Sequence, residues 1–156
     1  MAGAVLIGLG ATLLIDLWAL LLRRAFNIPS LNYCLLGRWV LSMPGGTLVH
    51  ENIGRSPARP HECGVGWTTH YLIGTGFGLA FVLLVGGQWL ERPTLWPALA
   101  FGAATVLVPF LTMQPAFGLG VAASKTPNPN KARLKSLVTH SVFGVGLYLW
   151  ARLLSP

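Results

Sequence analysis

Charge is scarce in this chain of 156 residues, and negative charge above all. Only 10% of the residues are charged, and Asp and Glu together number 4 against 11 Lys and Arg. Soluble domains carry about 25% charged residues, because charge keeps a folded surface in water. With 53% hydrophobic residues and a mean hydropathy of +0.62, a chain this short has more apolar surface than one soluble core can hide. The composition therefore excludes an ordinary soluble domain and indicates a membrane protein.

Familiar catalytic signatures are missing as well. The sequence contains no glycine-rich phosphate loop, no nucleophile elbow, no HExxH and no CxxC pair. The net charge of +7 is not accompanied by the interleaved basic and aromatic residues of a nucleic-acid surface. Nucleic acid is thereby excluded as a partner. The basic residues flank apolar segments instead, so the expected partner is the lipid bilayer.

Four apolar stretches are long enough to cross a bilayer, which requires about 20 predominantly apolar residues. None shows the strict alternation of a barrel strand, so α-helices are expected. The prediction is an all-α fold, an integral membrane four-helix bundle that forms one transmembrane domain over residues 1–156. Its helices are expected at about 2–24, 65–87, 94–113 and 133–154.

The distribution of Lys and Arg predicts the orientation. Nine of the eleven fall after the first helix or around the connection between the third and fourth, and only Arg92 and Arg152 fall on the other side. Short basic loops stay in the cytoplasm. Both termini are therefore expected outside the cytoplasm.

The first cytoplasmic loop is too long for a simple connection. Residues 31–43 follow Pro29 and Ser30, a plausible helix start, and place Leu31, Leu35 and Trp39 on one face. This pattern predicts a short interfacial helix on the inner membrane surface.

Four polar side chains, three within predicted helices and one at the inner end of the third, are expected near one level. Asp16, His70 and His140 should lie about 8 to 10 Å inside the cytoplasmic boundary at 1.5 Å per residue, with Gln114 slightly shallower. The two histidines belong to a repeat, Thr-His-x-x-x-Gly-x-Gly, that recurs after 70 residues. An intramembrane carboxylate is costly and marks a candidate functional site. The prediction is a ligand-binding site of these four residues, open to the cytoplasm.

Several occupants suit such a site. Two imidazoles and a carboxylate, from His70, His140 and Asp16, are a known ligand set for zinc or iron. Two facing histidines could instead hold haem b, or the cluster could relay protons or bind a small polar ligand. The structural alternative is that each histidine only joins helices through a hydrogen bond.

The loops offer further candidates. His50 and Glu51 are candidate catalytic residues, as further ligands or as a general base. His61, Glu62 and Cys63 are expected to be solvated loop residues. Cys34 and Cys63 both fall on the predicted reducing side, so no disulfide between them is expected.

Several short motifs resemble a known family. They are Asp16-Leu17-Trp18, His50-Glu51-Asn52-Ile53, Gly66-Trp67 with His70-Tyr71, and Met113-Gln114-Pro115-Ala116-x-Gly118-x-Gly120. The chain resembles the bacterial domain of unknown function numbered 2938, and the likeness covers nearly the whole sequence. The resemblance implies a four-helix protein of the bacterial inner membrane and assigns no activity, cofactor or partner.

The expected function is therefore binding of a metal ion or small polar ligand, with catalysis on a substrate from the inner leaflet as an extension. One alternative is a proton-coupled transporter or channel subunit, for which four helices would have to work as a homo-oligomer. The other is a structural or assembly protein without a ligand. Whether the protein is an enzyme stays open at this point.

Overall fold

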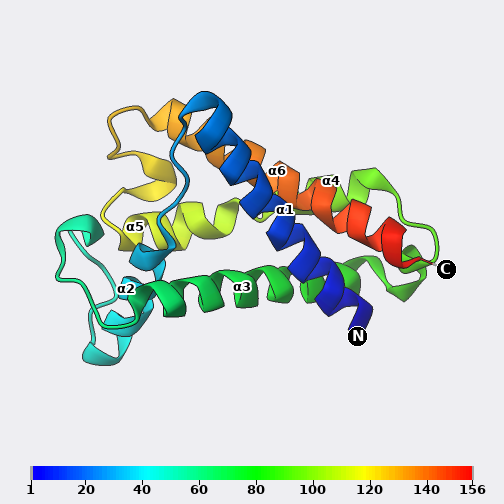
Figure 1. Ribbon diagram of the computed structural model, residues 1–156, viewed down its shortest axis with the longest axis horizontal. Helices are drawn as coiled ribbons and strands as arrows, with labels where there is room; N and C mark the ends of the chain where they lie inside the picture. The colour runs from blue at the N-terminus through cyan, green and yellow to red at the C-terminus, as the bar shows by residue number, and fades with distance from the viewer. Residues whose placement is uncertain (1, 156) are drawn as a thin grey trace. The chain divides into compact units, whose positions relative to one another are not determined.

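The computed structural model describes residues 2–155, and this part of the chain contains helices and no strands. Three-residue to five-residue helical turns of 3-10 or π type join the α-helices. The α-helices in chain order are α1 (Ala2–Phe26), α2 (Tyr33–Ser42), α3 (Glu62–Val85), α4 (Leu95–Ala104), α5 (Gln114–Ala116) and α6 (Pro129–Leu154) (Figure 1).

Four helical segments are long and apolar enough to cross a membrane, which confirms the predicted fold class. They are Ala2–Phe26, Glu62–Val85, Leu95–Ala116 and Pro129–Leu154. The protein is thus a multi-pass membrane protein. Helix α6 begins earlier than expected, because Asn128 caps it: its side-chain oxygen accepts a hydrogen bond from the Lys131 amide at 3.2 Å.

The third segment is not one regular helix. Helix α4 ends at Ala104, and the Thr105 hydroxyl donates to the Gly102 carbonyl at 2.6 Å. A π-helical turn follows at Pro109–Met113. Proline lacks the amide that an α-helix needs, and such a gap in the hydrogen-bond ladder is a common cause of an irregular turn. The helix expected at about 94–113 is therefore interrupted near its middle.

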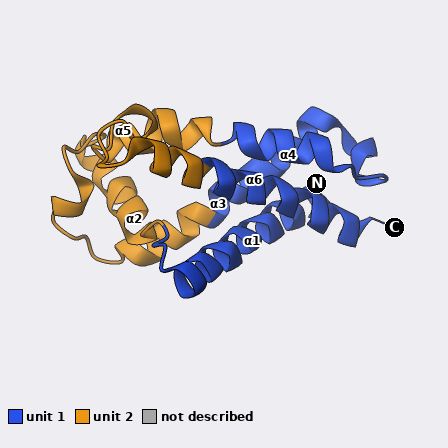
Figure 2. Cartoon of the chain, turned by 90° about the horizontal axis from the view of Figure 1, so that it is seen from above, with its two compact units in different colours: residues 1–30, 71–105, 137–156 blue, residues 31–70, 106–136 orange. Residues whose placement is uncertain are grey.

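The chain divides into two compact units (Figure 2). Unit 1 comprises residues 1–30, 71–105 and 137–156, and unit 2 comprises residues 31–70 and 106–136. In unit 1, segments of α1, α3, α4 and α6 enclose a core of seven buried residues. These are Ile7, Ala11, Phe81, Ala98, Phe143, Leu147 and Ala151.

Glycines let the helices of unit 1 approach one another closely. A Cβ atom at Gly74 of α3 would overlap the Thr12 side chain of α1, and one at Gly144 of α6 would overlap the backbone of α4. These two glycines occupy equivalent positions in the repeat found in the sequence. Small residues allow transmembrane helices to approach closely. The first glycine of each repeat copy therefore lies at a helix crossing, α3 with α1 and α6 with α4, and Gly146 of the second copy lies against Ala11 of α1.

Unit 2 has its own small core of Leu36, Ile53, Ala116 and Phe117. Helix α2 begins later than predicted, because Asn32 caps it by accepting a hydrogen bond from the Cys34 amide at 3.0 Å. Leu35 and Trp39, which were expected to face the membrane surface, pack against this core instead.

Candidate functional site

Asp16 of the predicted site lies in unit 1 and is half-buried. The Tyr71 hydroxyl of α3 donates a hydrogen bond to its carboxylate at 2.8 Å. The hydrogen bond satisfies part of the carboxylate and holds it in place, which lowers the cost of keeping a polar group in a spanning helix.

His140 also lies in unit 1. Its Nδ1 atom is 2.8 Å from the Thr105 hydroxyl oxygen. When Thr105 donates its one proton to the Gly102 carbonyl at 2.6 Å, Nδ1 of neutral His140 carries the hydrogen. The lone pair of the neutral ring is then on Nε2, the form in which a histidine binds a ligand through that atom.

His70 and Gln114 lie in unit 2. The His70 ring is stacked on Tyr33, with 4.1 Å between ring centroids, and meets Trp67 edge-on. Gln114 is only 7% exposed, and its side-chain oxygen is buried without a hydrogen-bond partner. Each unit therefore contributes two of the four predicted site residues.

The shared four-residue site stays a prediction, and so does a metal in it. Within residues 2–155, no group of three or more His, Cys, Asp or Glu side chains is arranged to hold a metal ion. Among the predicted catalytic candidates, His50 is the one whose side chain makes polar contacts in the structure.

Two segments distant in sequence meet at His50. The His50 amide donates to the Ala116 carbonyl at 2.8 Å, and the Ile53 amide donates to the Phe117 carbonyl at 3.1 Å. Gly118 has a φ of 84° and lies against the backbone of Glu51, where a Cβ atom would overlap the carbonyl. The His50–Ile53 and Met113–Gly120 motifs thus pack on one another. This close packing explains why residue 118 is a glycine.

One nitrogen of the His50 imidazole has a hydrogen-bond partner, and the other has none. Its Nδ1 atom lies 3.0 Å from the Ser56 hydroxyl oxygen, and its Nε2 atom is buried without a hydrogen-bond partner. The Ser56 hydroxyl oxygen is 3.4 Å from the Asn52 carbonyl oxygen, which is a long distance for a hydroxyl donor. The shorter contact favours donation from Ser56 to Nδ1. Ser56 was not among the predicted candidates, because its spacing from His50 forms no known motif.

Glu51, the other catalytic candidate, has an exposed side chain. Its backbone carbonyl, and not its carboxylate, makes the contact with Gly118. The structure therefore gives Glu51 a packing role at this loop and provides no geometric support for its carboxylate as a base.

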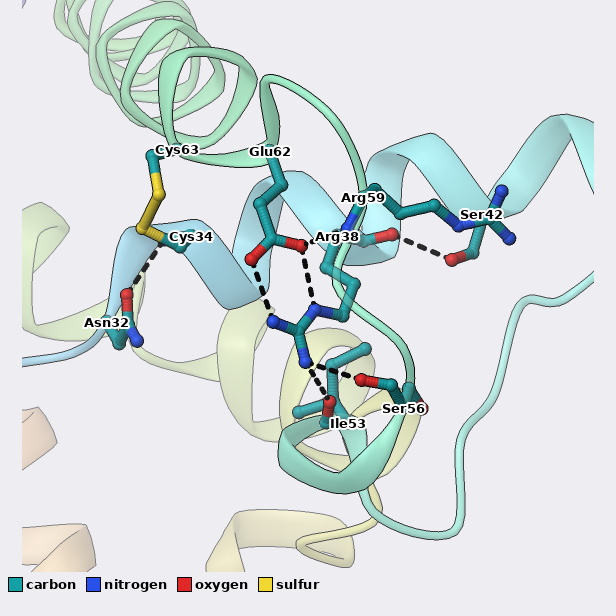
Figure 3. A network of polar contacts seen from close by, with 9 residues as sticks. All are labelled: Asn32, Cys34, Arg38, Ser42, Ile53, Ser56, Arg59, Glu62 and Cys63. Carbon is teal, nitrogen blue, oxygen red and sulfur yellow. Dashed lines mark hydrogen bonds and ion pairs between the residues drawn. A yellow bond between two sulfur atoms is a disulfide. The ribbon is translucent and has the colours of Figure 1, made fainter.

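A buried ion pair anchors the loop that carries Ser56 (Figure 3). The Arg38 guanidinium donates to both oxygens of Glu62, at 2.8 and 2.7 Å. Its remaining nitrogen donates to the carbonyls of Ile53 at 3.1 Å and Ser56 at 2.7 Å. Glu62 also accepts from the Arg59 amide at 2.7 Å. The hydrogen bond to Glu62, opposed by partial burial, raises the pKa of Arg38 above its ordinary value, so the guanidinium stays charged.

The expectation that Glu62 is a solvated loop residue is wrong, since it is 9% exposed and paired. The expectation that Cys34 and Cys63 form no disulfide is wrong as well, because the structure bonds them (Figure 3). Both errors have one cause. Helix α2 crosses the start of α3 in backbone contact at Gly37 and Gly66. That crossing brings two residues one turn apart on α2 to two adjacent residues of α3, and no local sequence pattern reveals it.

A family model described as a protein of unknown function, DUF2938, matches residues 5–154. The chain belongs to the DUF2938 family. No curated protein and no solved structure matches the chain. The DUF2938 match includes both units and every site residue described above, and it confirms the resemblance seen in the motifs.

Proposed function

We propose that this membrane protein binds a small polar ligand in unit 2, with His50 and Gln114 as the contacting residues. The observation that carries the proposal is a pair of orphaned polar atoms, Nε2 of His50 and the side-chain oxygen of Gln114. A buried polar atom without a partner costs about 1 to 3 kcal/mol. Binding of a polar ligand would recover that free energy.

The distribution of such atoms supports the assignment. In residues 2–155, three buried side-chain nitrogen or oxygen atoms lack a partner, and the third is Nε1 of Trp18 in unit 1. The two in unit 2 belong to the motifs that pack on each other at the Ala116 and Phe117 carbonyls. His50 presents an N–H donor when Ser56 donates to Nδ1, and Gln114 presents an acceptor. A neutral hydroxyl or amide compound matches both groups.

A divalent metal ion is the other ligand class. A flip of the Ser56 hydroxyl toward the Asn52 carbonyl would move the histidine hydrogen to Nδ1 and leave a lone pair on Nε2. The imidazole nitrogen then suits zinc or iron, with the Gln114 amide oxygen as a weaker second ligand. The ligand class thus depends on one hydroxyl rotor.

Native mass spectrometry and metal analysis of the purified protein test the proposal. The wild-type protein should carry a bound molecule or metal of constant mass. His50→Asn keeps a nitrogen near the Nδ1 position but removes Nε2, and Gln114→Met keeps the volume but removes the amide, so both variants should lose the ligand. Ser141→Ala, which removes a hydroxyl bonded only to the Leu137 carbonyl at 2.9 Å, is the control. A wild-type protein without ligand, or one whose ligand survives both changes, would refute the proposal.

A catalytic role is the second candidate, and the Ser56–His50 contact favours it. A serine within hydrogen-bond reach of an imidazole is the arrangement that activates a hydroxyl nucleophile. Leu48 and Val49, immediately before His50, are 58% and 68% exposed, so apolar surface adjoins the pair. Such a surface suits an acyl ester substrate that enters from lipid.

A fluorophosphonate probe tests this second candidate, because it reacts with activated serines. Peptide mass spectrometry should find the probe on Ser56 and not on Ser42, whose hydroxyl donates to the Arg38 carbonyl at 2.7 Å. His50→Asn should slow labelling at Ser56 about a hundredfold, because a general base contributes about 10² or more to the rate. Labelling that is absent from Ser56, or equal in both proteins, would reject catalysis by this pair.

A further inference from the structure

We propose that Cys34 and Cys63 form a redox-active site that exchanges with glutathione and controls the Ser56–His50 pair. The inference rests on the proposed function for its biological meaning, since it concerns regulation of the same loop. Its structural basis is independent of any ligand. The disulfide lies at one end of a chain of contacts that ends at His50.

Both cysteines lie at helix N-termini. Cys34 is the second residue of α2, and Cys63 is the second residue of α3. The positive end of a helix dipole stabilises a thiolate. The nearest carboxylate, Glu62, is neutralised by Arg38 and so does not oppose this effect. A disulfide whose thiolates are stabilised is a better electrophile, because its leaving group departs more readily.

Access differs between the two sulfur-bearing residues. Cys63 is exposed and Cys34 is half-buried. A glutathione thiolate is therefore expected to attack the sulfur of Cys63, which breaks the Cys34–Cys63 bond, forms a mixed disulfide on Cys63 and releases Cys34 as a thiolate. A second glutathione thiolate then attacks the glutathione sulfur of that mixed disulfide. It releases the Cys63 thiolate and glutathione disulfide, so two glutathiones lose two electrons and the protein gains them.

The contacts beyond the disulfide lead to the loop. Arg38 lies one turn after Cys34 on α2, and Glu62 directly precedes Cys63 on α3 (Figure 3). The guanidinium joins Glu62 to the carbonyls of Ile53 and Ser56. Ser56 in turn contacts His50 at 3.0 Å. The disulfide fixes α2 to α3 at the point where this guanidinium is placed, so its reduction is expected to loosen the Ser56–His50 contact.

The predicted orientation of the protein indicates which redox state of the disulfide is the usual one. The distribution of Lys and Arg predicts that the loop with His50 and Ser56 lies in the cytoplasm. There glutathione keeps most thiols reduced. The disulfide is then the oxidised state, in which the Ser56–His50 pair is held in place. The reduced state is the looser one.

The first part of the test is exchange in the folded protein. Detergent-purified protein is equilibrated with reduced glutathione without denaturant, and free thiols are counted by maleimide mass shift. Two maleimide additions are expected, with a glutathione adduct on Cys63 at early times. No addition before unfolding would overturn the proposal.

The second part is hydrogen–deuterium exchange of the peptide that contains residues 47–58, compared between oxidised and reduced wild-type protein. Reduction should increase exchange in this peptide roughly tenfold, which corresponds to about 1.4 kcal/mol in the opening equilibrium. Arg38→Lys cannot join Glu62 to the carbonyls of Ile53 and Ser56, so residues 47–58 of this variant should exchange fast in both redox states. Arg59→Gln, which keeps the backbone amide that contacts Glu62, should behave as wild type.

These readouts separate the two proposals. Redox-dependent exchange at residues 47–58 with no bound ligand and no serine labelling would refute the proposed function and keep the redox inference. Exchange at residues 47–58 that is equal in both states would overturn the redox inference, whatever ligand the protein carries.

Discussion

Arg38→Gln and Glu62→Gln, made singly and together, test whether the buried ion pair holds unit 2 together. Each side chain is only 11% exposed, so either single change leaves the other partner mostly buried without its counter-ion. Removing one partner of a buried pair costs about 3 to 5 kcal/mol. Because an arginine guanidinium does not lose its proton in proteins, Arg38 cannot relieve the cost in Glu62→Gln by becoming neutral.

We expect a loss of about 3 kcal/mol in the free energy of unfolding for each single variant, at the lower end of that range because the pair is not fully enclosed. The double variant should lose less than the sum, with a coupling of about 1 to 3 kcal/mol, because neighbours in one network are not additive. Arg38→Lys keeps the charge but cannot reach both carboxylate oxygens and two carbonyls at once. It should fall between wild type and Arg38→Gln.

Unfolding in mixed detergent micelles, followed by circular dichroism, provides the assay. Arg59→Gln is the matched control, because Arg59 contributes its amide and not its side chain to Glu62, and it should stay within about 0.5 kcal/mol of wild type. Additive losses in the double variant would show that the two residues act separately. Arg38 and Glu62 would then not link α2 to the Ser56 loop.

Three further predictions concern the disulfide, the helix pairs and the orientation. Cys34→Ser should lower stability under oxidising conditions by about 3 to 4 kcal/mol in thermal or denaturant unfolding, as expected for a loop whose ends are 29 residues apart, and should cost far less under reducing conditions. Gly144→Ala should cost about 1 to 3 kcal/mol by the same assay because its Cβ meets the backbone of α4, whereas Gly76→Ala, with open space around it, should be neutral or stabilising. Reporter fusions should place Ser155 outside the cytoplasm and Lys125 inside it, and a cytoplasmic C-terminus would refute the predicted orientation and the cytoplasmic setting of the redox site.

The membrane-spanning helices could be found in the sequence because each depends on a local property. A run of about 20 apolar residues matches the thickness of a bilayer wherever the other helices lie. The helix boundaries were harder to predict from hydropathy. Asn128 caps the start of α6 and Asn32 caps the start of α2 through side-chain hydrogen bonds, which a hydropathy pattern does not show. The interruption near Thr105 precedes a π-helical turn that begins at Pro109, a residue without the amide that an α-helix needs.

The candidate site was accessible to sequence reasoning only in part. Gln114 was predicted from its depth near the other three site residues, and His50 as a loop candidate. Each has a buried side-chain atom without a hydrogen-bond partner, and a binding role for them stays a prediction. Ser56 carried no signal, because its role depends on a loop that returns its hydroxyl to within 3.0 Å of His50. Asp16 and His140 were identified by their depth in spanning helices, and their partners Tyr71 and Thr105 come from neighbouring helices.

The amino-acid sequence by itself determined the four spans and the family, since hydrophobicity and motifs act along a continuous stretch of chain. The tertiary structure alone decided that Cys34 bonds to Cys63 and that Arg38 pairs with Glu62. Both pairs arise where Gly37 and Gly66 let two backbones touch. Such a crossing depends on packing between segments far apart in the chain, so a rule that considers one segment at a time cannot find it.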